Sequence, residues 1–420
     1  MRVTKALLFG CIFTVLFYVA TQAKTVTAIS CSASDVQAAI NQTSNGDTVT
    51  IPGGSATWNT TVTISNSHQI TLDGGGCSIT FSGGTLNVTA GNANNTRVTN
   101  FTFTGSGTNG NDVIELHTVT SPPSLTFRFD NNTLNCGSPS APATIVGVYF
   151  NGPGLLDHNS FTCSHGADEL IHVLGQGAED DSGWWDVITP GGANMIFIED
   201  NTFNDPGGAG ASAFQSYYGA RTVARHNTFT SMQIDQHGGG IGSRWWEFYN
   251  NNFTDAAGIC LRAGSGMVYG NTNTGIIHMT QEYGTYPAEW QVGQGQEVVH
   301  GTPSNCSNVG PPGCTHGYVW NDSLPLLNTN GCAAALPGMI AFERDAYAQG
   351  DGGNGVRTGT YASRPGTCTP YQGYWATDQN TLYQCTATNT WTSYYTPYTY
   401  PHPLQGTGPA PPTNLNAIGQ

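Results

Sequence analysis

The sequence predicts an all-β chain that coils as a single-stranded parallel β-helix, with three short strands in each coil. The main observation is a recurring phrase in which an asparagine is followed two places later by a leucine or phenylalanine, as in DHNSF at 157–161. The spacings between the asparagines are 27, 42, 26, 24 and 20 residues, which suits repeats that each form one supersecondary unit stacked on the next. The asparagines, the last in a degenerate copy, are Asn132, Asn159, Asn201, Asn227, Asn251 and Asn271.

Each repeat also contains the segments needed for three strands. Alternating side chains on both sides of the asparagine indicate two strands that meet at a corner, and a third segment lies upstream, as in ELIHVLG at 169–175. At the corner, the side-chain amide of each asparagine can bond to the identical amide of the next coil. A ladder of asparagines is therefore expected along one edge of the helix.

Residues 1–23 have the build of a secretory signal peptide. Arg2 and Lys5 precede an apolar run at 6–20, and the small residues that follow offer a cleavage site after Ala23. A membrane anchor is the alternative, but the run is short for a bilayer span. We expect a secreted, extracellular or cell-surface protein with no membrane span after cleavage.

The composition restricts the partners of the mature chain. Cleavage removes two of the 12 basic residues, which leaves ten against 27 acidic residues. A chain this acidic is a poor partner for nucleic acid. Aromatic residues make up 10% of the chain and apolar residues recur periodically, so the high glycine content does not indicate disorder. We expect an ordered protein that acts as a monomer.

The segment VGVYFNGPGLLDHNSF at 146–161 resembles the strand–turn–strand phrase, with its Trp-Ile/Val-Asp-His, of the pectate lyase superfamily. Members of that superfamily are right-handed parallel β-helices, so the resemblance implies this fold for roughly residues 31–300. Residues 35–54 are similar to the short amphipathic helix and first turn that cap such helices. In the superfamily the Asp-His phrase is associated with the core, which implies structural roles for Asp157 and His158.

The domain organisation follows from where the asparagine phrase ends. We expect the β-helix at 24–300 and a C-terminal extension, rich in glycine, proline and aromatic residues, at 301–405. This extension is expected to pack on the helix or cap it, with the segment YYTPYTYPHPL at 394–404 laid along the coils. Residues 406–420 resemble a linker.

Ten cysteines remain after cleavage, an even number that favours disulfides in an oxidising compartment. Cys136 and Cys163 both lie four places after a ladder asparagine, so they occupy equivalent positions one coil apart, a separation that a disulfide spans. The other expected pairs are Cys31–Cys77, Cys306–Cys314 and Cys368–Cys385, with Cys260 and Cys332 unassigned.

The spacing of 42 residues before Asn201 indicates an inserted loop at 175–194. In the resembled superfamily, loops at this corner form a wall of the substrate cleft. Adjacent tryptophans can stack on sugar rings, and clustered carboxylates can hold Ca²⁺ through oxygen ligands. The alternative is a loop that packs its tryptophans on the coil and leaves its acids in water. The tryptophans are Trp184 and Trp185, and the acids are Glu179, Asp180 and Asp181.

Four of the ten remaining basic residues lie on three consecutive coils: Arg221, Arg225, Arg244 and Arg262. Such a strip could bind the carboxylates of an acidic polysaccharide, with Arg221 and Arg244 at one corner of adjacent coils. In the resembled lyases an arginine removes the proton α to the uronate carboxyl, which suggests Arg262 as a base. The alternative is that the arginines neutralise the acidic column two places before the asparagines, formed by Asp130, Asp157 and Glu199.

Histidines occur on or near the first strands of several coils, at His172, His237 and His278. The segment QHGGGIGS at 236–243 resembles the Gly-His-Gly segment of polygalacturonases. The paired aspartates of those hydrolases are absent, because the preceding strand has Gln215 and Tyr217 instead. Inverting hydrolysis needs two carboxyl groups, so this difference argues against that activity. A glycine-rich strand where two coils approach closely is the non-catalytic alternative.

Together these features predict a secreted carbohydrate-active protein, with a polysaccharide lyase that cleaves a uronate-containing polymer by β-elimination as the first hypothesis. A non-catalytic glycan-binding protein and a polygalacturonase-like hydrolase are the alternatives. The expected catalytic residues are His237, Arg262, Tyr217 and His172, gathered with Arg244 on one face below the inserted loop.

Overall fold

The computed structural model describes most of the chain. The described residues are 22–90, 95–105, 112–118, 127–137, 144–149, 152–164, 169–175, 188–208, 212–237, 242–255, 258–280, 292, 295–296, 314–323, 325–327, 342–343, 345–350 and 355–406. The signal-peptide prediction falls almost entirely outside them, as does the tail after residue 406. No helix among these residues has both the length and the apolar character needed to cross a bilayer.

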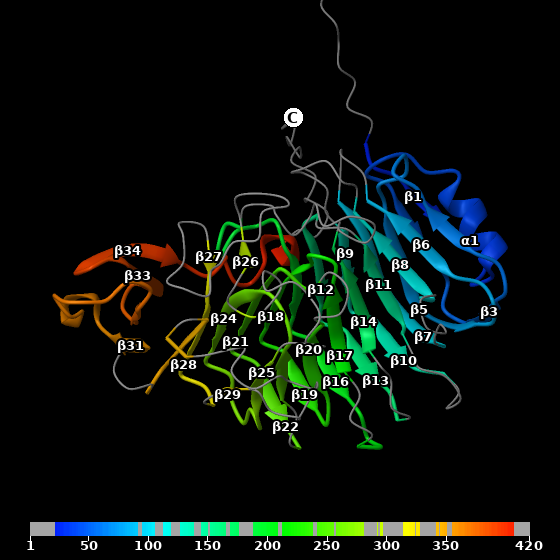
Figure 1. Ribbon diagram of the computed structural model, residues 1–420. Helices are drawn as coiled ribbons and strands as arrows, with labels where there is room; N and C mark the ends of the chain where they lie inside the picture. Colours follow the sequence, from blue (N-terminus) through cyan, green and yellow to red (C-terminus); the bar gives the residue numbers. More distant parts are fainter. Residues whose placement is uncertain are drawn as a thin grey trace, which may run out of the picture.

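The chain folds as the expected all-β, right-handed parallel β-helix with three strands per coil (Figure 1). The first sheet contains ten parallel strands in chain order. These are β4 (Val62–Ile64), β6 (Leu86–Thr89), β8 (Ile114–His117), β11 (Val146–Tyr149), β14 (Glu169–Leu174), β17 (Ser212–Tyr217), β20 (Gln233–Gln236), β23 (Ile259–Leu261), β25 (Ile277–Met279) and β29 (Pro325–Leu327).

The second and third sheets are joined because two long strands, β5 (Thr71–Phe81) and β7 (Thr96–Thr104), pass through the corner between them. The other strands of the second sheet are β1 (Thr25–Thr27), β2 (Thr48–Thr50), β9 (Phe127–Asp130), β12 (Gly154–Asp157), β15 (Ile196–Glu199), β18 (Arg221–Arg225), β21 (Trp245–Tyr249), β24 (Ser265–Tyr269), β28 (Gly317–Trp320) and β30 (Ala346–Ala348). Those of the third sheet are β3 (Ser55–Trp58), β10 (Thr133–Asn135), β13 (Ser160–Thr162), β16 (Thr202–Asn204), β19 (Thr228–Thr230) and β22 (Asn252–Thr254).

The asparagine ladder is confirmed. In each step the backbone N–H and the side-chain Nδ2 of one asparagine both donate to Oδ1 of the next, at 2.9–3.1 Å for the step from Asn159 to Asn201 and the step from Asn201 to Asn227. The ladder ends at Asp322, whose carboxylate accepts from Asn271. Asp322 lies beyond the last asparagine phrase, so the repeat alone did not indicate it.

The residue before each ladder asparagine explains why the corner repeats. It has a positive φ in every coil, for example 55° at His158 and 59° at Asp200. Asparagine, aspartate, histidine and glycine adopt this left-handed conformation more readily than other residues. These residue types supply the corner in all coils, at Asn131, His158, Asp200, His226, Asn250 and Gly270.

Replacing Asn201 with alanine is expected to lower the free energy of unfolding by about 1–3 kcal/mol. The change removes the acceptor of two buried donors of Asn159, its backbone N–H and its Nδ2. Denaturant titration measures the effect, and Thr202→Ala, at the exposed next position, is the matched control. Equal stability of the two variants would show that the ladder amides do not stabilise the coil.

The interior is built from the aromatic residues that follow the asparagines. Phe161, Phe203, Phe229 and Phe253 are fully buried and stack along the axis with centroid distances of 4.8, 5.0 and 4.9 Å. Stacked rings at this separation are favourable beyond the area they bury. The position two places after each asparagine therefore supplies a continuous row of core side chains.

The N-terminal helix α1 (Ala33–Ile40) covers one end of the stack, as expected (Figure 1). Ser32 caps it, because its hydroxyl accepts from the Asp35 N–H at 3.2 Å. The helix buries Ala33, Val36, Ala39 and Ile40 against the first coils, which shields apolar residues and strand edges that would otherwise be exposed.

Three of the expected disulfides are present: Cys31–Cys77, Cys136–Cys163 and Cys368–Cys385. Cys260 is also disulfide-bonded. The expected Cys306–Cys314 pair stays a prediction, because Cys306 lies outside the described residues. Cys332 also lies outside them.

Parallel pairing continues beyond residue 300, the expected end of the helix. β28 pairs with β24, and β30 pairs with β28, so further coils are formed by residues that lack the asparagine phrase. A short antiparallel pair, β26 (Gly295–Gln296) and β27 (Cys314–Thr315), lies between. Coils can therefore form without the asparagine phrase.

A four-stranded sheet follows at the far end of the stack (Figure 1). Its strands are β31 (Val356–Gly359), β32 (Gly373–Ala376), β33 (Thr381–Ala387) and β34 (Thr390–Tyr395), with single turns of 3₁₀ helix at Tyr361–Ser363 and Pro403–Gly406. Aromatic residues from this sheet and from the second sheet share one apolar cluster, in which Trp375 contacts Tyr269 and Trp320. The aromatic extension therefore packs against the outer face of the second sheet.

The outer face of the third sheet has an unusual composition. Two parallel rows of side chains run across its coils, and all of them are serine, threonine or asparagine. The first row contains Ser55, Ser78, Thr102, Thr133, Ser160, Thr202, Thr228 and Asn252. The second row contains Thr57, Thr80, Thr104, Asn135, Thr162, Asn204, Thr230 and Thr254. We call these two rows the hydroxyl face.

Candidate functional site

The outer face of the first sheet brings several of the expected site residues together. Ile171 and Val173 point into the core, so His172 between them points outward. His172 lies in register with Gln215, which lies in register with Asp235 on the next coil. Two places further along the strands, a second outward row contains His117, Tyr149, Leu174 and Tyr217. His237 and Arg262 directly follow the last paired residues of β20 and β23, Gln236 and Leu261.

Three of these residues form an aromatic cluster. The rings of His172 and Tyr217 meet edge to face at 4.8 Å, and the ring of His237 stacks on Tyr217 at 4.2 Å. The Tyr217 hydroxyl donates to Oε1 of Gln215. All three rings are half-buried, so they remain accessible from solvent. We call His172, Tyr217 and His237 the His–Tyr–His cluster.

The protonation of His172 is set by its surroundings. Burial lowers the pKa of its imidazole to about 4. Nδ1 lies 4.0 Å from a carboxylate oxygen of Glu169. The ring is consequently neutral at neutral pH and offers an unprotonated nitrogen to a ligand.

Arg262 lies beside this cluster but is held by a carboxylate. Its backbone N–H donates to Gln236 C=O, and its guanidinium forms two hydrogen bonds with Asp235, at 2.9 and 2.6 Å. Both side chains are buried, with 9% and 5% exposed. A guanidinium in a two-point ion pair stays protonated, which conflicts with the role of base suggested by the sequence.

Arg221 and Arg244 lie at the corner between the first and second sheets. The Arg244 N–H donates to Ala220 C=O, so the two arginines lie near one corner of adjacent coils, as the spacing suggested. Both are buried, and Arg244 Nη1 donates to the Thr315 hydroxyl at 3.2 Å.

Residues 176–187 of the inserted loop lie outside the described part of the chain. Its tryptophans Trp184 and Trp185, and its carboxylates Glu179, Asp180 and Asp181, therefore stay predictions, as does Ca²⁺ binding. Among the residues that are described, no group of three His, Cys, Asp or Glu side chains is arranged to hold a metal ion.

The same face carries a second group that the sequence analysis did not select. The Tyr149 hydroxyl donates to Asp112 at 2.7 Å, the His117 ring stacks on Tyr149 at 4.5 Å, and His117 Nε2 lies 3.1 Å from Glu115. Burial raises the pKa of Asp112 to about 6, against the hydrogen bond from Tyr149, which lowers it. Tyr149 is in register with Leu174, and Leu174 is in register with Tyr217. Aligning the first strands of successive coils would therefore have pointed to Tyr149 and its partners.

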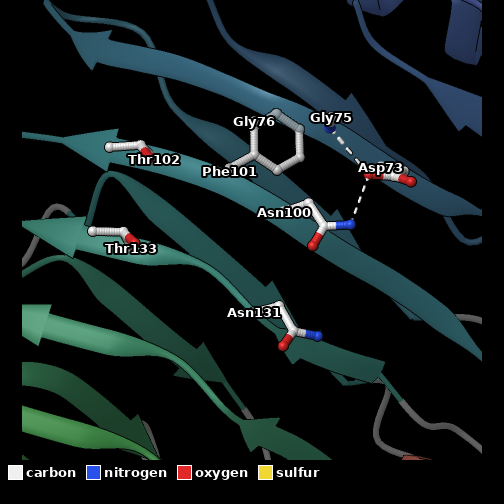
Figure 2. A pocket seen from close by; sticks show the side chains of 8 residues that line it. All are labelled: Asp73, Gly75, Gly76, Asn100, Phe101, Thr102, Asn131 and Thr133. Carbon is white, nitrogen blue, oxygen red and sulfur yellow. Dashed lines mark hydrogen bonds between the residues drawn. The ribbon is translucent and has the colours of Figure 1, made fainter. Parts of the chain in front are cut away.

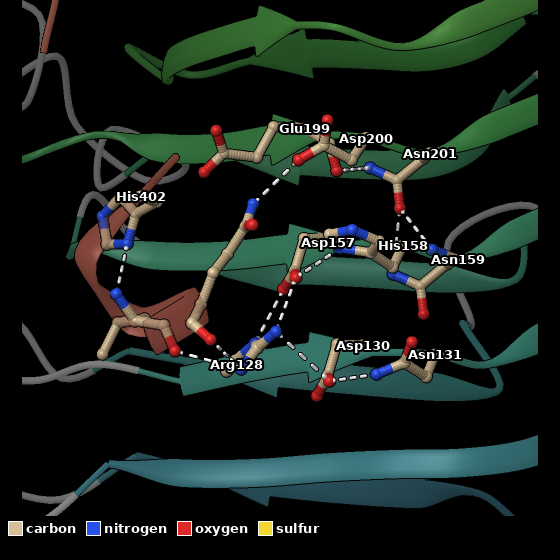
Figure 3. A network of polar contacts seen from close by, with 12 residues as sticks. Arg128, Asp130, Asn131, Asp157, His158, Asn159, Glu199, Asp200, Asn201 and His402 are labelled. Atoms are coloured by element: carbon tan, nitrogen blue, oxygen red, sulfur yellow. Dashed lines mark hydrogen bonds and ion pairs between the residues drawn. The ribbon is translucent and has the colours of Figure 1, made fainter. Parts of the chain in front are cut away.

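The acidic column two places before the asparagines is neutralised by arginines, and Figure 3 shows Arg128 between Asp130 and Asp157. Arg225 is the member of the predicted strip that pairs with this column, whereas Arg97 and Arg128 lie outside that strip. Arg97 Nε bonds to Asp130 at 2.7 Å, and Arg128 forms a two-point pair with Asp157 at 2.9 and 2.8 Å. Arg225 Nε bonds to Glu199 at 2.7 Å.

Asp157 is fully buried in this network, and its neighbour His158 points its Nδ1 toward it at 2.9 Å. The Arg128 and Arg225 guanidinium groups also hold the C-terminal tail, which we define as residues 396–406. Arg128 Nη1 donates to the Leu404 carbonyl at 3.0 Å, and Arg225 donates to the carbonyls of Tyr398 and Thr399 at 2.6 and 2.8 Å. The network thus joins coils and tail, and it supports the structural role expected for Asp157.

Acid should weaken the attachment of this tail through His402. Burial, together with the nearby charges of Arg225 and Arg128, lowers the pKa of His402 from its ordinary value of 6.5 to about 4. Between these values the unfolded chain binds the proton more readily, so stability falls as pH drops through this window. We expect His402 alone to lower the free energy of unfolding by about 1–2 kcal/mol between pH 7 and pH 5.

His402→Asn removes the titrating group and should reduce that loss. Denaturant titrations at the two pH values measure it, with His158→Asn at a more exposed position as the control. An unchanged pH dependence in His402→Asn would contradict the assignment.

Comparison with known proteins adds little to this geometry. No protein-family model matches the chain, and no curated protein matches it. Among solved structures, a mannuronic acid specific polysaccharide family 6 lyase from human gut microbiota aligns over 80% of this chain and 81% of its own, with 15% sequence identity and a TM-score of 0.41. A likeness this distant carries no argument about activity.

Proposed function

We propose that the chain is a secreted polysaccharide lyase that cleaves a uronate-containing polymer by β-elimination on the outer face of the first sheet. The single observation that carries this proposal is the His–Tyr–His cluster, in which two imidazoles flank one phenol at ring distances of 4.8 and 4.2 Å. Imidazole and phenol are suited to remove and donate protons in such a reaction.

In the proposed reaction His237 acts as the base. Its imidazole accepts the proton on the carbon α to the uronate carboxyl, the electrons of that C–H bond form a carbon–carbon double bond, and the bond to the glycosidic oxygen breaks. The Tyr217 hydroxyl gives its proton to the leaving oxygen. Gln215 accepts a hydrogen bond from that hydroxyl and so orients it. His172, neutral beside Tyr217, is placed to contact the substrate.

The paired arginine supports this assignment of the base. Because Arg262 is bound at two points by Asp235, its side chain serves to hold Asp235 and is not available to accept a proton. The same pair weakens the case for a hydrolase, since both Asp235 oxygens are engaged and inverting hydrolysis needs two available carboxyl groups.

The test is an assay of the full mature chain on alginate, polygalacturonate and glucuronan, each with added Ca²⁺ and with a chelator. Elimination creates an unsaturated uronate, so ultraviolet absorbance should rise on at least one polymer. New reducing ends without absorbance would indicate a hydrolase. Binding without either signal would indicate a glycan-binding protein, and a difference between the Ca²⁺ and chelator arms would test the metal prediction.

A further inference from the structure

A polar pocket lies at the corner between the second and third sheets, near the N-terminal end of the stack (Figure 2). It is open to solvent and lies on a different sheet from the His–Tyr–His cluster. The side chains that matter for recognition are Asp73, Asn100, Thr102, Asn131 and Thr133. Figure 2 shows the two threonines on neighbouring strands, with the aspartate and the asparagines at the corner beside them.

The pocket exists because β5 contains a bulge. Asp73 pairs with Thr99 and Cys77 with Phe101, so the three glycines at 74–76 face the single residue Asn100. Gly75 and Gly76 have φ values of 55° and 81°, which suit glycine. A Cβ at Gly74 would meet the Phe101 ring at 2.6 Å and the Asn100 carbonyl oxygen at 2.7 Å, so the close approach also requires glycine.

The pocket presents both acceptors and donors. Asp73 Oδ1 accepts from the Gly75 N–H at 3.0 Å and from Asn100 Nδ2 at 2.9 Å, which fixes the carboxylate. Asn131 Nδ2 donates to Asp130. Each of these amides keeps a second N–H and an oxygen for a ligand, and Thr102 and Thr133 add two hydroxyls to the lining.

This set of groups selects a class of ligand. Alternating hydroxyl donors and oxygen acceptors match the hydroxyl groups of a sugar ring. The Asp73 carboxylate, with no lysine or arginine among the residues that line the pocket, disfavours a uronate or another anion here. The chemistry therefore points to a neutral sugar, in contrast to the substrate proposed for the first sheet.

The hydroxyl face continues from the pocket along the third sheet. Thr102 and Thr133 belong to its first row, followed by Ser160 and Thr202 on the next coils. Neither row contains an ionisable side chain, and successive coils lie about 4.8 Å apart, close to the length of one pyranose unit in an extended glycan. Each coil can therefore offer a hydroxyl or amide group to one sugar residue.

We propose that the pocket and the hydroxyl face form a binding site for a neutral, extended polysaccharide. The bulged corner holds one sugar, and the rows of the third sheet contact the residues that follow. This site does not depend on the reaction proposed for the first sheet.

Calorimetric titration of the full mature chain with the β-1,4-linked hexasaccharides of xylose, glucose and mannose tests the proposal. Binding of at least one of them is expected. The double variant Thr102→Val and Thr133→Val keeps the β-branched shape but removes two hydroxyls, and should weaken that binding about tenfold or more. Thr63→Val, an exposed threonine on β4 of the first sheet, is the matched control and should bind as the parent does.

Failure of all three neutral hexasaccharides to bind would overturn the proposal, as would unchanged affinity in the double variant. Preferential binding of a hexauronate at the same threonines would also overturn it. His237→Ala should retain neutral-sugar binding. The proposed sugar site and the proposed reaction on the first sheet can therefore be tested separately.

Discussion

Replacing His237 with alanine should lower turnover on the responsive uronate polymer by about 100-fold or more, the size of contribution typical of a general base. The imidazole stacks on Tyr217 at 4.2 Å, so its removal takes away the proposed proton acceptor and one neighbour of the phenol. The side chain is half-buried on the outer face, and the fold should survive its loss. Initial rates from ultraviolet absorbance give kcat and KM separately.

Tyr217→Phe tests the proton donor in the same assay. It keeps the ring contacts with His172 and His237 but removes the hydroxyl that bonds to Gln215. We expect kcat to fall with little change in KM, because the hydroxyl acts on the leaving oxygen. His278→Ala, on the same face at β25, is the control. If both cluster variants keep full kcat, the His–Tyr–His cluster is not the active site.

Arg225→Met should lower the free energy of unfolding by about 3–5 kcal/mol. The arginine and its partner Glu199 are both fully buried, with a 2.7 Å bond between Nε and the carboxylate. Burial already raises the pKa of Glu199, and the Arg225 charge opposes that rise. Methionine fills the volume but leaves the carboxylate without its counter-charge. It also removes the donors to Tyr398 and Thr399, which should expose the C-terminal tail to proteases.

Arg364→Met is the matched control for this prediction. Arg364 lies over the rings of Tyr361 and Tyr383 at 4.4 and 4.5 Å, and it forms no ion pair with a carboxylate among the described residues. Its loss should change stability by less than about 1 kcal/mol. Denaturant titration and limited proteolysis measure both effects. A stable Arg225→Met variant with a protected tail would show that apolar packing alone holds the tail.

The sequence by itself determined the features that repeat from coil to coil. The ladder from Asn132 to Asn271, the phenylalanine stack and the Cys136–Cys163 disulfide all follow from equal offsets within a repeat, because stacked coils place equal offsets side by side. The outward direction of His172 was left open by the sequence, and the burial of Ile171 and Val173 on either side of it decides it.

Contacts outside the repeat were decided only by the tertiary structure. Arg225 bonds to the carbonyl of Tyr398, 173 positions away, and Asp322 ends a ladder whose phrase it does not contain. From the sequence, Arg262 could be a base or the partner of a carboxylate. Only the structure shows that its guanidinium pairs with Asp235 of the preceding coil. The pocket at Asp73 depends on a bulge that shifts the strand register. These contacts join segments that are not related by the repeat, so the periodicity of the sequence does not predict them. Their atoms come within bonding distance only when the coils, loops and tail pack together.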